Sequence, residues 1–320
     1  MGIKSFSFTL IVVFSLTSGL AGCKSAPKVS VPNPIVIPPP PPPTVSNVPV
    51  DKPEEKPVQP PPAQVPSETK KVALILGPGG AKALAHVGVL KALQQQRVPI
   101  GKVIGLEWGA LIAGLYANKG QVHDVEWKLY KMEQQNLPMP KNFLRRSEGS
   151  VKMLEGYFTD AFGSDDVSAA RVGFACPSRS IWSGVVTWQN RGSFKDAMKR
   201  CLTFPPVLTV QGNFIAGASQ ASEAVEQLTR EGYGLIVLVN VLGSAMPVAQ
   251  DAVMDNVNNV ILWQEVKRAL METSRQKIIT INVDTSAYPM VKFDAKKELI
   301  QLGESVGQRA AYELVSKFGF

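Results

Sequence analysis

Residues 72–117 read VALILGPGGAKALAHVGVLKALQQQRVPIGKVIGLEWGALIAGLYA, and this stretch decides the fold. Its first part, 72–76, is an apolar run that ends in glycine, which predicts a short buried strand. A loop of small residues, 77–80, follows the strand. From Ala81 onward, apolar residues recur at every third position, as they do on one face of a helix. The stretch therefore begins as strand, glycine loop and helix.

The second half of the stretch is also a strand followed by a helix, joined by a sharp turn. A short strand at 103–104 leads into the sharp turn Gly105-Leu106-Glu107-Trp108-Gly109, and a second helix then reaches Ala117. We expect the glycine amides at the start of the first helix to point at this turn. Amides at a helix N-terminus bind anions or stabilise a developing oxyanion. The sequence thus predicts an anion-binding site between the loop and the turn.

Four loop residues carry a resemblance to a known family: Gly77, Gly79, Gly80 and Lys82, followed by the helical string AHVGVL at 85–90. They are similar to the patatin-like phospholipase domain, which joins a G-G-G-x-R/K-G oxyanion loop to a G-x-S-x-G nucleophile elbow. The resemblance extends over about 71–318. It implies a hydrolase scaffold in which a serine attacks an ester carbonyl and an aspartate accepts the serine proton.

The chain departs from this pattern at the residues that perform the chemistry. Gly105 and Gly109 match the outer positions of the elbow, but Glu107 stands where the family has its serine. Ala216 stands where the resemblance places the aspartate of the family's D-G-G or D-G-A segment. A glutamate acting as nucleophile would form an anhydride, and a methyl group cannot accept a proton. The sequence therefore predicts a degenerate site, to which we assign no catalytic residue.

The oxyanion loop survives in outline. Pro78 replaces a glycine and removes one N–H donor, and Ala83 replaces the closing glycine. Trp108 places a large ring beside the elbow, where the family has a small residue. We expect the carboxylate of Glu107 to occupy the family's oxyanion site, held by the loop amides and by Lys82.

The rest of the chain alternates between helical and extended patterns. We expect helices at about 123–134, 151–162, 194–202, 221–230, 248–274 and 296–318, and strands at 172–176, 183–188, 235–241 and 278–283. Such alternation predicts a mostly parallel sheet covered by helices on both faces. The expected fold class is thus α/β, a patatin-like three-layer sandwich that occupies residues 70–320.

Two segments precede this domain. Residues 1–22 combine Lys4, an apolar run and small residues, as a secretory signal peptide does. The ending Leu-Ala-Gly before Cys23 resembles a bacterial lipobox, which implies cleavage and lipidation of Cys23. Residues 23–69 are rich in proline and form the expected lipid-anchored tether, extended in the polyproline II conformation. In a Gram-negative cell this predicts an outer-membrane lipoprotein that faces the periplasm.

The cysteines, the histidines and the net charge limit which bonds, ligands and partners we expect. Cys176 and Cys201 could pair in an exported protein, but the sequence does not decide this. The two histidines, His86 and His123, stand far from any cysteine pair, so we expect neither a metal nor a cofactor. The net charge of +8 comes from scattered lysines and arginines, which favours an anionic envelope surface over nucleic acid.

These observations leave two functions open. We expect a lipid-anchored pseudoenzyme of the cell envelope that binds or scaffolds, with a lipid or an envelope protein as its partner and an oligomeric state that the sequence does not reveal. The alternative is a phospholipase-type lipid acyl hydrolase that uses residues outside the motifs. An adaptor that binds partners through its proline-rich tether is a third class.

Overall fold

The computed structural model describes residues 71–132, 150–210, 212–243 and 257–320. Within these ranges, seven strands form one sheet in the order β4-β3-β2-β1-β6-β7, and β5 pairs with β3. The expected signal peptide, Cys23 and the tether lie outside the described residues.

The centre of the sheet is parallel. β1 (Val72–Leu76) pairs with β2 (Ile100–Gly105) on one side and with β6 (Leu235–Asn240) on the other. β3 (Gly173–Ser180) extends this sheet beyond β2, and β7 (Ile279–Asn282) extends it beyond β6. Every residue of β1 is fully buried, which explains why it reads as an unbroken apolar run.

One side of the sheet ends in antiparallel strands. β4 (Val186–Gln189) and β5 (Phe214–Ala216) both run antiparallel to β3. The sequence pattern predicted the first of these strands but not β5. Only three residues long, β5 is defined by its pairing with Ser178–Ser180 of β3 and not by a periodicity of its own.

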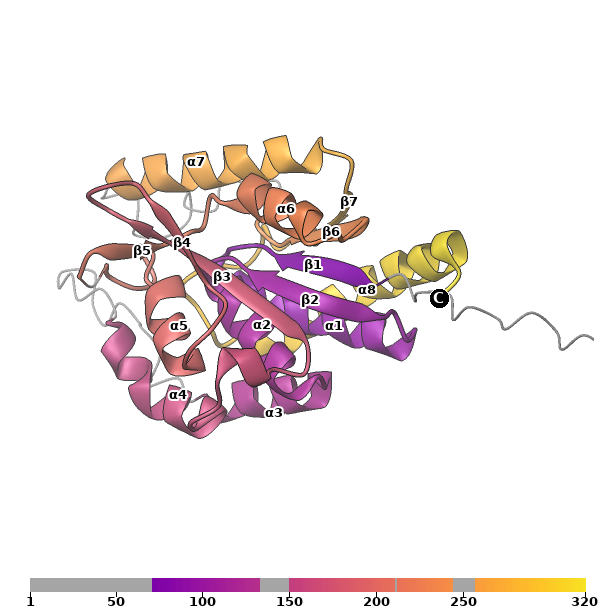
Figure 1. The fold of residues 1–320 in the computed structure, drawn as a ribbon, viewed down its shortest axis with the longest axis horizontal. Coiled ribbons are helices and arrows are strands. Elements are labelled where there is room, and N and C mark those ends of the chain that lie inside the picture. The colour runs from indigo at the N-terminus through magenta and orange to yellow at the C-terminus, as the bar shows by residue number, and fades with distance from the viewer. Residues whose placement is uncertain (1–70, 133–149, 211, 244–256) are drawn as a thin grey trace, which may run out of the picture. The chain divides into compact units, whose positions relative to one another are not determined.

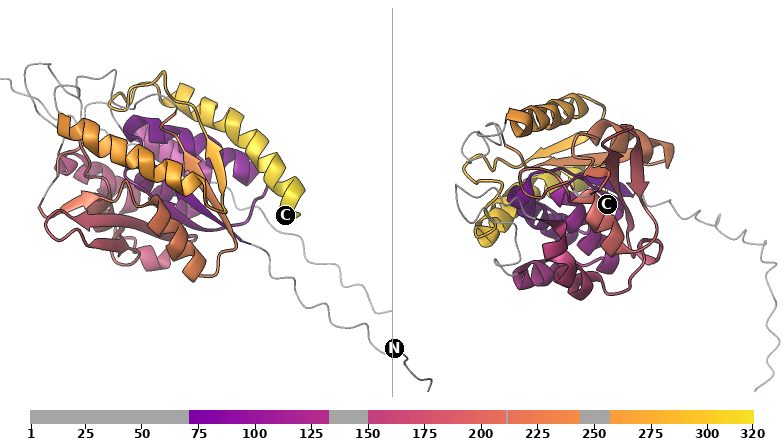
Figure 2. Two further views of the ribbon diagram at one scale, coloured as in Figure 1. Left: turned by 90° about the horizontal axis from the view of Figure 1, so that it is seen from above. Right: turned by 90° about the vertical axis from the view of Figure 1, so that its left-hand side faces the viewer.

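Helices cover both faces of the sheet, as the α/β prediction required (Figures 1 and 2). On one face lie α6 (Ala221–Arg230) and α7 (Val257–Ser274). On the other lie α1 (Ala85–Gln95), α2 (Trp108–Lys119), α3 (Val122–Lys131), α4 (Glu155–Phe162), α5 (Phe194–Cys201) and α8 (Lys296–Phe318). The predicted part of α7 at 248–256 lies outside the described residues. No helix of the described ranges is long and apolar enough to cross a membrane.

Local differences from the predictions have simple causes. The first helix starts with a 3-10 turn, Gly80–Leu84, because the chain must leave the tight glycine loop before it can enter α1. A second 3-10 turn, Val151–Leu154, opens the helix that the pattern predicted as continuous from residue 151. Met153 in this turn is 45% exposed. A third turn, Val167–Ala169, precedes β3.

A disulfide joins Cys176 of β3 to Cys201 of α5. Both residues are fully buried, and the pairing answers the question that the sequence left open. The bond fixes the antiparallel end of the sheet to the helix that packs on it.

Glycines allow α1 and α8 to pack backbone to backbone. A Cβ atom added to Gly303 of α8 would overlap the carbonyl oxygen of Ala85, and one added to Gly88 of α1 would overlap the carbonyl oxygen of Ile300. Neither obstacle is a flexible side chain, so the overlap could be relieved only by moving a helix. These two positions hold the last helix against the helix that follows the glycine loop.

We predict that Gly303→Ala lowers the free energy of unfolding by about 3 kcal/mol or more, because the new methyl group forces two packed helices apart. Gly156→Ala in α4 is the matched control, since a Cβ atom there meets nothing within 4 Å. That control should raise stability by up to about 1 kcal/mol, the ordinary gain from replacing a helical glycine. Denaturant unfolding of both variants measures the difference, and equal stabilities would contradict the close packing.

Candidate functional site

The sharp turn between β2 and α2 has the backbone of a nucleophile elbow. Glu107 has φ 51° and ψ −127°, a backbone conformation that residues other than glycine rarely adopt. Three backbone hydrogen bonds hold the turn. Leu106 N–H donates to the carbonyl of Leu76 at 2.9 Å, Gly109 N–H to that of Leu106 at 2.9 Å, and Ala110 N–H to that of Glu107 at 2.8 Å. The strained position that carries the serine in a G-x-S-x-G elbow is thus kept, with a glutamate in it.

The flanking glycines are required by close packing. A Cβ atom on Gly109 would lie 2.6 Å from the carbonyl oxygen of Gly77 and would also overlap the carbonyl of Leu76. One on Gly105 would overlap the backbone of Ala110. The first turn of α2 therefore presses against the end of β1 and the start of the loop. This contact brings Glu107 to the glycine loop.

The loop amides bind the Glu107 carboxylate. Its Oε2 atom accepts hydrogen bonds from Gly79 N–H at 2.9 Å and Gly80 N–H at 3.0 Å. Gly80 has φ +56°, which turns its N–H inward at the start of the 3-10 helix. Glu107 is 0% exposed. We expected the Glu107 carboxylate to accept hydrogen bonds from the loop amides. The structure confirms this for the amides of Gly79 and Gly80.

Lys82 is also buried, and its ammonium donates to the carbonyl of Leu242 at 3.3 Å. The sequence led us to expect Lys82 at the Glu107 carboxylate, and that contact stays a prediction. The bond to Leu242 ties the glycine loop to the loop after β6.

Burial controls the protonation of Glu107. Loss of solvent raises the pKa of its carboxyl group to about 7, and the hydrogen bonds from the amides of Gly79, Gly80 and Trp108 oppose part of that rise. The Oε1 atom is buried and has no hydrogen-bond partner in the described residues. A proton on the carboxyl group removes the cost of burying a charge there.

Two further polar side chains surround the loop. His86 is fully buried, and its Nε2 lies 2.8 Å from the carbonyl oxygen of Gly77. Burial lowers the pKa of His86 to about 4, so the ring is neutral at pH 7 and donates from Nε2. Trp108 packs its ring against Phe293, with the centroids 4.5 Å apart. His86 therefore supports the loop.

Ala216 ends β5, where the family pattern led us to expect an aspartate position. Its N–H donates to the carbonyl of Thr203 at 2.9 Å, and its methyl group is 2% exposed. The residue pairs with Ser178 of β3. It supplies no proton acceptor to the site.

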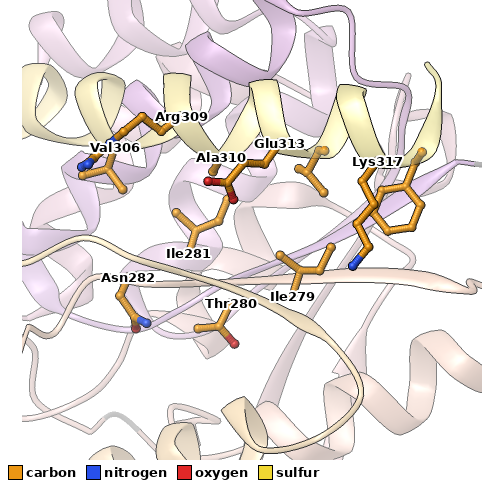
Figure 3. A pocket seen from close by; sticks show the side chains of 11 residues that line it. Ile279, Thr280, Ile281, Asn282, Val306, Arg309, Ala310, Glu313 and Lys317 are labelled. Atoms are coloured by element: carbon orange, nitrogen blue, oxygen red, sulfur yellow. The ribbon is translucent and has the colours of Figure 1, made fainter.

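Glu107 is fully buried, and it lines none of the cavities found among the described residues. One of ≈340 Å³ lies between β7 and α8, where Ile279 and Ile281 face Ala310 and Glu313 (Figure 3). None of its lining residues belongs to the glycine loop or the elbow. In the described part of the chain, no group of histidine, cysteine or acidic side chains could hold a metal ion.

Comparison with known families agrees with this geometry. Residues 74–228 match the family model described as Patatin-like phospholipase, a range that includes the loop, the elbow and Ala216. This match covers just under half of the chain and confirms the resemblance predicted from the two motifs. The matched part therefore resembles a scaffold of the lipid-hydrolase type.

Relatives share short parts of much longer chains. The chain is 47% identical over 53 residues to the lysophospholipase nte1 of Neurospora crassa, which is 17% of this chain and 4% of that protein. It is 25% identical over 181 residues to the lysophospholipase NTE1 of Coccidioides immitis, covering 54% and 12%. The chain thus spans only a small fraction of the length of these relatives.

Two solved structures resemble the domain at low sequence identity. VipD from Legionella pneumophila is 14% identical with a TM-score of 0.45, over 78% of this chain and 67% of VipD. ExoU of Pseudomonas aeruginosa, solved in complex with SpcU, is 13% identical with a TM-score of 0.42, over 78% and 53%.

Sequence reasoning missed the contacts that come from distant residues. Phe293 covers the ring of Trp108, and the carbonyl of Met290 accepts a hydrogen bond from Ala81 N–H at 2.7 Å. Both come from the segment before α8, whose sequence has no motif. Only the tertiary structure brings this segment to the glycine loop.

The raised pKa of Glu107 predicts a pH-dependent contribution to stability. In the unfolded chain the carboxyl group ionises near pH 4.5, and in the folded protein it does so near pH 7. Protonation therefore favours the folded state, and this contribution is complete below about pH 4.5 and is lost as the pH rises through 7. The total change is roughly 3 kcal/mol.

The free energy of unfolding of Glu107→Gln, which keeps an acceptor oxygen without the ionisation, isolates this effect. The stability of the wild type relative to this variant should fall between pH 4.5 and 7. The lowered pKa of His86 acts in the opposite direction, since its stabilising effect is lost as the pH falls from 6.5 through about 4. That effect is common to both proteins and cancels in the difference, so a pH-independent difference would contradict the burial of an ionisable Glu107.

Proposed function

We propose that this chain is a lipid-anchored, patatin-like pseudoenzyme of the bacterial cell envelope that binds or scaffolds and does not hydrolyse. The observation that supports this most directly is the carboxylate of Glu107 on the amides of Gly79 and Gly80. Those amides are the donors that a hydrolase of this scaffold needs for its transition state.

Three requirements of ester hydrolysis fail together at this site. The elbow carries a carboxylate whose acyl product would be an anhydride, which is reactive and costly to form. The loop donors are already engaged by that carboxylate, which is fully buried. Ala216, at the expected position of the general base, has no group that accepts a proton.

The alternative is a lipid acyl hydrolase that uses other residues. The patatin-like match and the lysophospholipase names of the relatives favour this class. Ser219 and Ser222 are the serines next to the lost aspartate position. Neither sits on a strand-to-helix elbow: Ser219 lies between β5 and α6, and the hydroxyl of Ser222 lies 2.8 Å from that of Thr273. The pseudoenzyme therefore explains more of the site.

A fluorophosphonate probe separates the two classes. The wild-type protein should give no stoichiometric adduct and no phospholipid turnover above background, because no activated serine faces an oxyanion site. A stoichiometric adduct on a serine would instead favour the hydrolase.

The same probe tests whether Glu107 blocks an otherwise competent scaffold. The double variant Glu107→Ser with Ala216→Asp should gain labelling, since it restores nucleophile and base and frees two amide donors. Its matched control is Glu107→Ala with Ala216→Asp, which frees the same amides without a nucleophile. Equal labelling of the two would show that the reaction occurs outside the elbow.

The proposed anchor rests on the sequence before the domain. The lipobox-like ending at Cys23 and the proline-rich tether 23–69 support an acylated protein held at a distance from the bilayer. Acyl chains contribute about 0.8 kcal/mol per buried methylene, so several chains hold a protein firmly. We propose the periplasmic side of an outer membrane as its location, with the envelope supplying the partner.

Metabolic labelling with palmitate in a bacterial host tests the anchor. The wild type should incorporate label and remain in the membrane fraction, while Cys23→Ser should lose both, because no thiol remains to be acylated. Retention of label in the variant would place the lipid elsewhere. Deletion of 27–66 tests the adaptor alternative, which requires that partner capture disappear while the domain stays folded.

A further inference from the structure

The hairpin of β3 and β4 ends in an exposed apolar tip. We define the hairpin tip as residues 181–185, in which Ile181 is 44% exposed, Trp182 81% and Val185 60%. The hairpin lies beside α7 (Figure 1). A single exposed apolar side chain is ordinary, but three within five residues, including a tryptophan, mark a surface that contacts something other than water.

The hairpin tip is held in place by hydrogen bonds. Gly184 N–H donates to the carbonyl of Ser180 at 2.9 Å, and Ile181 N–H donates to the carbonyl of Asn213 at 2.9 Å. The indole N–H of Trp182 donates to Oδ1 of Asn213 at 3.2 Å. The apolar side chains are therefore presented in an ordered turn. Binding through them costs little conformational entropy, because the turn is already formed.

A charged groove opens beside the hairpin tip. It has a volume of ≈250 Å³, and Arg179 and Gly184 of the hairpin line it together with residues of α6 and α7. Its charged side chains are Arg179, Glu223, Glu265, Arg268 and Glu272. None of these five forms an ion pair with another described residue, although Glu265, Arg268 and Glu272 share one face of α7. Two cations and three carboxylates thus face one groove without pairing with each other.

This combination of charges matches a zwitterion. Guanidinium groups bind phosphate oxygens through paired N–H donors, and carboxylates accept hydrogen bonds from an ammonium group. A phosphate linked to an ammonium-bearing alcohol, as in a phospholipid headgroup, carries both charges a few ångströms apart. A purely anionic ligand would be repelled by the three glutamates.

The position of the groove beside the hairpin tip indicates how such a ligand would arrive. Tryptophan favours the interface between water and lipid, where its ring contacts hydrocarbon and its N–H stays near polar groups. Isoleucine and valine on the same turn would enter the acyl region below. A stable protein interface instead takes about 20 to 30 residues from each partner, far more than this turn offers.

We propose that the hairpin tip and the charged groove form a docking surface for a phospholipid bilayer, with the tip in the interfacial layer and a zwitterionic headgroup in the groove. This surface lies outside the degenerate hydrolase site and adds a second membrane contact to the proposed anchor. It does not depend on acylation of Cys23.

The test uses the full chain carrying Cys23→Ser, so that no acyl chain contributes, and vesicles of phosphatidylethanolamine and phosphatidylcholine. In this background, Trp182→Ser should lower the vesicle partition coefficient about tenfold, the ratio expected when one large apolar side chain no longer enters the bilayer. The matched control is Trp127→Ser on α3, whose side chain is 56% exposed, and it should change partitioning by about twofold at most. An equal loss in both variants, or none in either, would overturn the proposal.

The groove is tested by Arg179→Gln combined with Arg268→Gln. Removing both cations should weaken partitioning about threefold or more, because each charge-assisted bond to a phosphate is lost. If partitioning were unchanged, the groove would not bind a lipid headgroup, and the proposal would be wrong.

A spectroscopic readout remains decisive if a variant folds poorly. Vesicles with brominated acyl chains should quench the tryptophan fluorescence of the Cys23→Ser chain. Trp182→Phe, which keeps an aromatic ring at the tip, should abolish most of this quenching, whereas Trp127→Phe should leave it. Quenching that survives Trp182→Phe would contradict insertion of the tip. Self-association lost in Trp182→Ser while vesicle binding is kept would show that the tip contacts a second copy of the chain.

Discussion

Two hydrogen bonds, from the amides of Gly79 and Gly80 to one carboxylate oxygen of Glu107, hold the centre of this domain together. They connect the loop after β1 to the turn after β2. Because both flanking glycines of the turn pack against backbone, the first turn of α2 is held close to the loop. A geometry suited to stabilising a transient negative charge has here become a permanent internal contact.

This contact explains why the elbow keeps its strained backbone with a glutamate at its centre. A positive φ at a glutamate costs free energy and persists only where surrounding structure enforces it. Here the two loop amides hold the Glu107 carboxylate, and the ring of Phe293 packs on the ring of the next residue, Trp108. Under the proposed function the site serves as a structural junction. Three exposed apolar side chains lie apart from it, at the tip of the β3–β4 hairpin.

Much of this could be predicted from the sequence, for identifiable reasons. β1, α6 and α8 have the predicted bounds because their apolar patterns are long or continuous and are closed by clear end signals. The occupant of the anion site could be predicted because a G-x-x-x-G elbow fixes the direction of its central side chain. Local patterns carry these features, so one chain suffices to recognise them.

Other features depend on residues that meet only in three dimensions. β5 exists through its pairing with β3, and the disulfide joins cysteines that are 25 residues apart in the sequence. The bond from Lys82 to the carbonyl of Leu242 forms because the loop after β6 runs beside the glycine loop. Neither the spacing of residues nor the composition determines which of these distant segments lie side by side.

The dependence of the glycine loop on residues 290–318 has a consequence for folding. The carbonyl of Met290 accepts a hydrogen bond from the loop, and the helix behind the loop packs against α8. A nascent polypeptide in which residues 290–318 have not yet been synthesised lacks both partners. The centre of the domain therefore assembles only after this segment has been made.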